Sequence, residues 1–218
     1  MKFSLGARAA AEFLGIAFLV AAVVGSGIMA ERLAGGNMAL VLLANSIATG
    51  AALTALILTL AEISGAHLNP AVTLSTALVG AFPWFETPHY ILAQTLGGVS
   101  GTVMAHLMFG LPLISISQHA RSGPAQVFSE FVATFGLLAV IRGCARRPSA
   151  AVAVAVASYI TAAYWFTSST SFANPAVTLA RSLTNTFSGI QPANVPLFIV
   201  GQLAGAFAAT VLFRRLPA

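Results

Sequence analysis

Six long apolar segments place the strongest constraint on the fold of this chain of 218 residues. A helix needs about 20 mostly apolar residues to cross a bilayer. Segments of this kind run near residues 10–30, 38–60, 89–110, 127–143, 149–168 and 195–213. Only 7% of the residues are charged, against roughly a quarter in an average soluble domain. The sequence therefore predicts an all-α membrane protein with six transmembrane helices.

Two further apolar segments are too short to cross a membrane. Residues 69–80 read NPAVTLSTALVG, and residues 174–185 read NPAVTLARSLTN. Nine or ten helical residues rise about 15 Å, half of a hydrocarbon core about 30 Å thick. Asparagine is a preferred N-cap, and proline is favoured at the first helical position. We therefore predict two re-entrant half-helices that begin at Asn69 and Asn174, enclosed by protein or by a water-filled cavity.

The two halves of the chain repeat the same pattern. AEFLG at 11–15 matches SEFVA at 129–133, and PHYILAQTLGGVSG at 88–101 matches PLFIVGQLAGAFAA at 196–209. Three spans in each half reverse the orientation of the second half in the membrane. The prediction is one membrane domain over residues 1–218, made of inverted repeats at about 8–110 and 125–216. The N-termini of the two half-helices would then meet near the midplane.

The meeting point of the half-helices is predicted to be a pore. Each helix N-terminus carries about half a positive charge, so a pair repels cations and protons but leaves amide donors for an uncharged solute. The carbonyl groups before each asparagine are expected to be free, because the chain there is predicted to be extended. These carbonyls belong to Gly65, Ala66 and His67 in the first half and to Ser171, Phe172 and Ala173 in the second.

Glu12 and Glu130 each lie inside a predicted span. An ionisable group at that depth is costly and is a functional candidate. One hypothesis is a proton relay in a carrier. The other is structural, in which each carboxylate accepts hydrogen bonds from the irregular backbone of the nearby re-entrant loop. One glutamate in each half favours the structural role.

The remaining polar residues indicate orientation rather than chemistry. Seven of the ten basic residues lie on one side of a six-span arrangement: Lys2, Arg8, Arg142, Arg146, Arg147, Arg214 and Arg215. The other three are Arg32 and Arg121 on the opposite side and Arg181 in the second re-entrant region. This asymmetry predicts a multi-pass protein of the cell inner membrane with both termini in the cytoplasm. Sparse basic residues at the ends of apolar segments argue against nucleic-acid binding. No nucleophile–base pair or metal-ligand spacing is visible, so no enzyme activity, metal or cofactor is expected.

These motifs resemble the aquaporin, or major intrinsic protein, family along nearly the whole chain. The matching stretches are AEFLG, SGAHLNPAVTLS, SEF and ANPAVTLARS. The resemblance implies a six-span right-handed bundle in membrane lipid, one pore in each subunit and a homotetramer. It also implies that the pore motifs are Asn69, Pro70 and Ala71 in the first half and Asn174, Pro175 and Ala176 in the second.

The resemblance also implies a selectivity filter of four positions. Counting from the two asparagines without gaps gives Thr49, Ala162, Ser171 and Val177. The family usually has arginine where this chain has Val177, and all four residues are small or medium and uncharged. A wide filter is therefore expected. Arg181 lies one helical turn further on and is expected either to face the outer vestibule or to anchor a loop.

The function predicted from these features is passive passage of small uncharged solutes. The expected solutes are glycerol, urea, water, and arsenite with similar metalloid hydroxides, because the NPAVTLARS segment resembles a bacterial branch of the family that lacks the filter arginine and is linked to arsenical handling. Two alternatives stay open. One is a water-restricted aquaporin, and the other is a proton-coupled carrier that uses Glu12 or Glu130.

Overall fold

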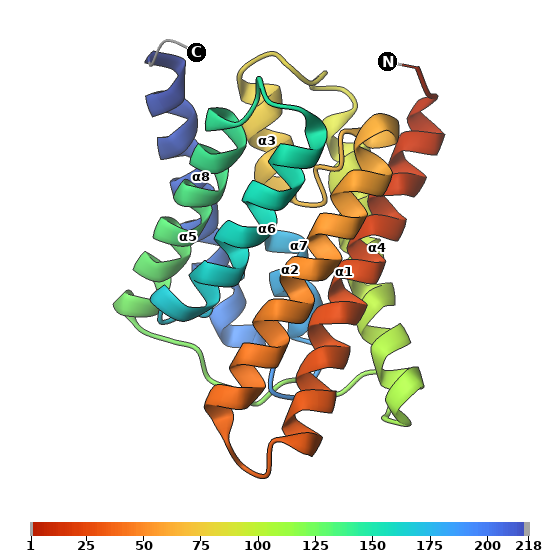
Figure 1. The fold of residues 1–218 in the computed structure, drawn as a ribbon, viewed down its shortest axis with the longest axis vertical. Coiled ribbons are helices and arrows are strands. Elements are labelled where there is room, and N and C mark those ends of the chain that lie inside the picture. The colour runs from red at the N-terminus through yellow and green to blue at the C-terminus, as the bar shows by residue number, and fades with distance from the viewer. Residues whose placement is uncertain (1, 216–218) are drawn as a thin grey trace.

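The computed structural model describes residues 2–215, and the regular structure in that range is entirely helical (Figure 1). Six helical segments in it are long and apolar enough to cross a membrane. The spanning helices are α1 (Leu5–Leu33), α2 (Met38–Ser64), α4 (Thr87–Phe109), α5 (Pro124–Gly143), α6 (Ser149–Phe166) and α8 (Val195–Arg215), the last preceded by the 3₁₀ turn η1 (Pro192–Asn194). The predicted all-α fold with six spans is confirmed.

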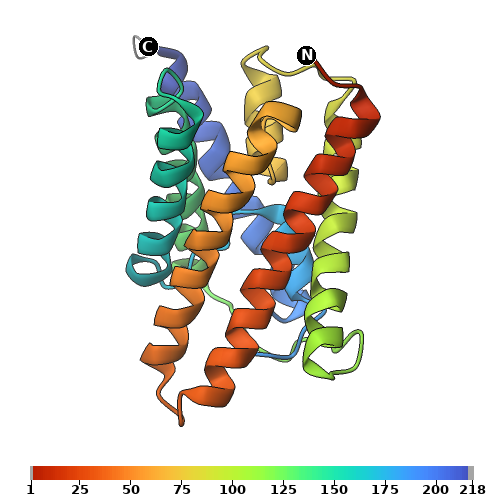
Figure 2. The same cartoon turned by 45° about the vertical axis from the view of Figure 1, so that its right-hand side comes forward.

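Two short helices, α3 (Pro70–Leu78) and α7 (Pro175–Arg181), complete the bundle. Both chain ends lie at the same end of the molecule, with α3 in that half of the bundle and α7 in the other (Figures 1 and 2). The α7 helix has 7 residues, fewer than predicted. It ends at Arg181 because the chain turns away, and the Arg181 carbonyl accepts a hydrogen bond from the backbone N–H of Ile190 at 3.2 Å.

Both half-helices begin as the sequence predicts. The side chain of Asn69 accepts a hydrogen bond from the backbone N–H of Ala71 at 2.8 Å, and Pro70 stands at the first helical position. Asn174 likewise accepts from the N–H of Ala176 at 3.0 Å. Each asparagine therefore satisfies a backbone donor that a helix start leaves without an intrahelical partner.

Glycines let the spanning helices cross at close range. A Cβ atom on Gly97 of α4 would overlap the carbonyl oxygen of Phe13 in α1. In the second half, a Cβ on Gly205 of α8 would overlap the carbonyl oxygen of Phe131 in α5. The α1–α4 and α5–α8 pairs therefore pack backbone against backbone, as small residues four apart allow in membrane helices.

Gly97→Ala is expected to destabilise the protein, because the new methyl group must push α1 and α4 apart. The expected loss is about 1–3 kcal/mol, the usual cost of overpacking. Thermal unfolding of the purified protein in detergent measures the effect. Gly6→Ala in the first turn of α1 is the matched control, since a Cβ there meets nothing within 4 Å. Equal melting temperatures for both variants would show that this crossing is not tight.

Candidate pore and constriction

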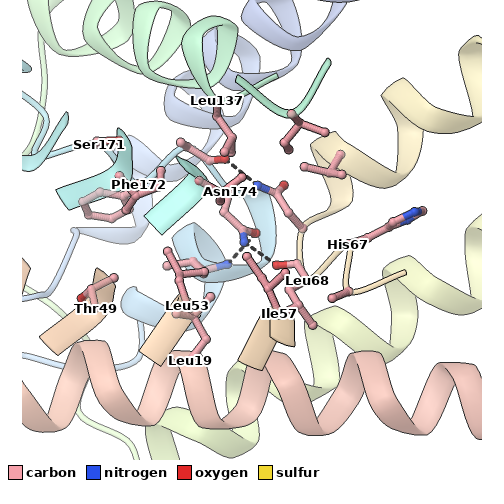
Figure 3. Close-up of a pocket in the computed structure, with 18 of the residues that line it drawn as sticks. Leu19, Thr49, Leu53, Ile57, His67, Leu68, Leu137, Ser171, Phe172 and Asn174 are labelled. Atoms are coloured by element: carbon pink, nitrogen blue, oxygen red, sulfur yellow. Dashed lines mark hydrogen bonds between the residues drawn. The ribbon is translucent and has the colours of Figure 1, made fainter. Parts of the chain in front are cut away.

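Asn69 and Asn174 bind the two re-entrant loops to each other at the centre of the bundle. The Nδ2 group of Asn69 donates to the carbonyl oxygen of Ala173 at 2.7 Å. The Nδ2 group of Asn174 donates to the carbonyl oxygen of Leu68 at 2.7 Å, as Figure 3 shows. Each amide nitrogen carries two N–H donors, so one N–H of each asparagine remains for a solute in the adjacent cavity.

The backbone before each asparagine is not extended, and the sequence prediction is wrong on this point. Ala66 and Leu68 have φ values of 45° and 47°, and Ser171 and Ala173 have values of 50° and 49°. Left-handed conformations at residues other than glycine cost of order 1–3 kcal/mol each and persist only where surrounding contacts hold them. The contacts that hold these loops come from the two buried glutamates.

Glu12 of α1 holds the first loop. Its carboxylate accepts hydrogen bonds from the backbone N–H groups of His67 at 2.9 Å and Leu68 at 2.7 Å. The hydroxyl of Ser64 and the side-chain amide of Gln94 also donate to it, at 2.6 and 2.7 Å. The Glu12 side chain is fully buried, and its oxygens accept from the loop, from the end of α2 and from α4.

Glu130 of α5 holds the second loop in the same way. Its carboxylate accepts from the backbone N–H groups of Phe172 at 2.9 Å and Ala173 at 2.8 Å. The side-chain amide of Gln202 donates to it at 2.6 Å. Neither Glu12 nor Glu130 is among the described residues that line the cavity. These contacts favour the structural role for both glutamates over a proton relay.

The cavity is lined in part by residues whose carbonyl groups have no protein donor. The hydrogen bonds of residues 2–215 include none to the main-chain oxygens of five of the expected residues, and all five residues lie on the cavity: Gly65, Ala66, His67, Ser171 and Phe172. Ala173 differs, because its carbonyl accepts the bond from Asn69. The expectation of a free carbonyl is therefore wrong for Ala173.

The cavity has a volume of about 300 Å³ and lies along the interior of the bundle. Its lining extends from Thr76 and Arg142, in the half that holds the termini, past both asparagines to Thr49 and Tyr164. Apolar side chains also line the cavity, among them Leu19, Leu53, Ile57 and Leu137 (Figure 3). A lining that combines carbonyl acceptors with apolar side chains suits a small solute that carries hydroxyl groups and no charge.

Three of the four predicted filter positions line the cavity, namely Thr49, Ser171 and Val177. Ala162 does not, because it is exposed on the outer surface of α6. Tyr164 lines the cavity instead, and its hydroxyl lies 3.1 Å from the Thr49 hydroxyl. Side chains on one face of a helix recur every three or four residues, so Ile160 and Tyr164 share a face from which Ala162 points away.

Phe172 and Arg181 also line this part of the cavity, and the count of four positions missed both. The Arg181 guanidinium carbon lies 3.4 Å from the centroid of the Phe172 ring. Its Nε group donates to the carbonyl oxygen of Ser188. Arg181 therefore anchors a loop and faces the cavity at once. In the sequence, Arg181 follows Val177 by four residues, and this spacing on one helix face indicates that both side chains can reach the cavity.

A bundle of six spans around two half-helices and an internal cavity defines a membrane channel. The sequence matches the family model described as Major intrinsic protein over residues 2–150 and 144–217. The chain therefore belongs to the major intrinsic protein family.

The relatives agree with this assignment. The chain is 54% identical over 215 residues to Aquaglyceroporin AqpS of Rhizobium meliloti (strain 1021), an alignment that covers 99% of this chain and 92% of that protein. It is 36% identical over 219 residues to Aquaporin NIP1-4 of Oryza sativa subsp. japonica, covering 95% of this chain and 76% of that protein.

A solved structure shares the fold. The aquaglyceroporin from Plasmodium falciparum superposes with a TM-score of 0.74 at 23% identity, covering 97% of this chain and 95% of that one. The family match and the six spans make the protein a multi-pass membrane channel of the major intrinsic protein family. Such channels are not enzymes.

Proposed function

We propose that the channel passes small uncharged solutes larger than water, with arsenite and similar metalloid hydroxides, urea and glycerol among them. The observation that carries this proposal is the constriction. Thr49, Ser171 and Val177 present short side chains to the cavity. The Ser171 hydroxyl is buried and has no hydrogen-bond partner within residues 2–215, so it is available to a solute.

Arsenite fits this chemistry because its undissociated form is neutral and carries three hydroxyl groups, like a short polyol. Free carbonyl groups accept from such hydroxyls, and Ser171 Oγ can accept or donate. Val177, where arginine is usual in the family, leaves space beside them. The description of the bacterial relative as an aquaglyceroporin supports passage of polyols.

The pore itself is proposed to be centred on the two Asn-Pro-Ala motifs, Asn69–Ala71 and Asn174–Ala176. The asparagine N–H groups and the free carbonyls would form the solute path, and Thr49, Tyr164, Ser171 and Val177 the narrowest part. The matching hydrogen bonds of Glu12 and Glu130 support two inverted repeats. We further propose a homotetramer.

The proposed location is the cell inner membrane, with both termini in the cytoplasm. The two termini lie at one end of the bundle (Figure 2). Arg142, Arg146, Arg147 and Arg214 belong to the same end, since α5 finishes and α8 finishes there. An excess of basic residues near span ends marks the cytoplasmic side.

Proteoliposomes containing the protein test the proposed solutes directly. Uptake of water, glycerol, urea and arsenite is measured in one preparation, with empty vesicles as the baseline. We expect glycerol and arsenite uptake at least tenfold above the baseline, without saturation and without response to a pH gradient. Water flux alone would instead establish a water-restricted aquaporin, and saturable uptake driven by a pH gradient would establish a proton-coupled carrier.

A further inference from the structure

Two arginines and one aromatic ring form a compact cluster beside the constriction. The guanidinium carbons of Arg181 and Arg121 lie 3.4 Å and 5.1 Å from the centroid of the Phe172 ring. The Phe172 side chain is 5% exposed and lines the cavity. Arg181 comes from α7, and Arg121 from the segment before α5. We call these three residues the arginine clamp.

The guanidinium of Arg121 donates hydrogen bonds to the surrounding loops. Its Nε group donates to the carbonyl oxygen of Gly189 at 2.8 Å, and its Nη2 group to that of Phe187 at 3.3 Å. Its Nη1 group contacts the carbonyl oxygen of Ser169 at 3.4 Å. Arg121 therefore acts as a brace for the loop between α7 and η1 and for the loop that leads to Ser171.

The guanidinium of Arg181 makes fewer hydrogen bonds than that of Arg121. Only its Nε group has an acceptor, the Ser188 carbonyl, so the hydrogen bonds of residues 2–215 leave Nη1 and Nη2 without a protein acceptor. The one salt bridge within that range joins Arg8 to Glu86. Arg181 is 1% exposed, yet it lines the cavity. A guanidinium in this position is a fixed positive charge in a poorly solvated site.

We propose that Arg181 supplies the positive charge of this constriction and makes the channel reject protons and other cations. A fixed charge in surroundings of low dielectric acts strongly on an ion at short range. Arg181 lies four residues, about 6 Å along the helix axis, beyond Val177. Width and charge are thus set by different residues, with Val177 leaving space for the solute and Arg181 repelling cations. The proposal rests on channel activity and not on the identity of the solute.

Arg181→Met tests this proposal, because methionine keeps an apolar chain against Phe172 and removes the charge. Proteoliposomes are assayed in parallel for glycerol flux, by light scattering, and for proton flux under an imposed membrane potential, with a pH-sensitive dye inside. We expect the ratio of proton flux to glycerol flux to rise at least tenfold over the wild type. Arg181→Lys keeps a charge and is expected to hold the ratio within about threefold of the wild type.

Arg32→Met is the matched control. Arg32 also lies over a phenylalanine ring, 5.1 Å from the centroid of Phe109, and donates to a carbonyl oxygen, but it is exposed and does not line the cavity. It is expected to leave both fluxes unchanged. If Arg181→Met conducts glycerol and excludes protons as the wild type does, the proposal is overturned. Arg181→Gln is a second variant without the charge. If Arg181→Met, Arg181→Gln and Arg181→Lys all fail to fold, the proposal is also overturned, because the main role of Arg181 would then be its hydrogen bond to the Ser188 carbonyl.

The two readouts keep this inference separate from the proposed solute range. Absence of glycerol flux in the wild type would contradict the proposed function, and the proton fluxes of the wild type and of Arg181→Met, compared at equal protein content, would still report on Arg181. Normal glycerol flux with an unchanged proton barrier in Arg181→Met would contradict only the role assigned to the arginine clamp.

Discussion

Glu130→Ala is expected to abolish or severely reduce the folded protein. The change leaves the backbone N–H groups of Phe172 and Ala173 buried without an acceptor, and it also removes one of the two acceptors of the Gln202 amide. Each unsatisfied buried group costs about 1–3 kcal/mol, so the two N–H groups alone predict a loss of about 2–6 kcal/mol. That is a large part of the 5–15 kcal/mol by which folded proteins are typically stable. Thermal unfolding in detergent and yield of dispersed protein measure the effect.

Glu62→Ala is the matched control for this experiment, because Glu62 is an exposed glutamate near the end of α2. It is expected to change the melting temperature little. Glu130→Gln keeps one acceptor oxygen and should be less damaging than the alanine variant. A stable Glu130→Ala protein that still conducts glycerol would show that the loop holds its left-handed backbone without the carboxylate. A stable protein that has instead lost pH-driven uptake would favour the carrier.

Val177→Arg is expected to reduce glycerol and arsenite flux at least tenfold while water flux continues. Val177 lies on the cavity and is 5% exposed. A longer guanidinium side chain at this position would fill the space beside Thr49 and Ser171. Stopped-flow measurement of water flux and of glycerol flux on the same vesicles distinguishes a narrower pore from a smaller amount of folded protein.

Val177→Leu separates bulk from charge in this test. It adds one methylene group and no hydrogen-bond donors, so a smaller fall in glycerol flux is expected than for the arginine variant. If glycerol flux and arsenite flux in Val177→Arg are the same as in the wild type, position 177 is not at the narrowest point of the pore. The constriction would then have to be placed elsewhere, for instance at Tyr164 and Phe172.

The count along the sequence failed at Ala162 for a geometric reason. Counting assumes a constant number of residues between the pore motif and the constriction, but a side chain reaches the cavity only from the inner face of its helix. Tyr164 is on that face of α6, and Ala162 is on the exposed one. The filter that we propose therefore includes Tyr164, whose hydroxyl lies 3.1 Å from that of Thr49.

The features that could be predicted from the sequence depend on residues close together in the chain. The six spans follow from the length of the apolar segments, and the starts of α3 and α7 follow from Asn-Pro, because capping depends on adjacent residues. The binding of loop N–H groups by Glu12 and Glu130 was expected from their burial and symmetry. These features depend on properties that each segment carries by itself.

The sequence alone therefore determined the membrane class, the two half-helices and the family. The tertiary structure decided which side chains meet on the cavity wall, including Tyr164 from α6 and Phe172 and Arg181 around the second half-helix. It also decided that the Ala173 carbonyl is occupied by Asn69. These contacts join residues from separate elements, and their geometry depends on helix rotation and loop path, which no local sequence pattern specifies.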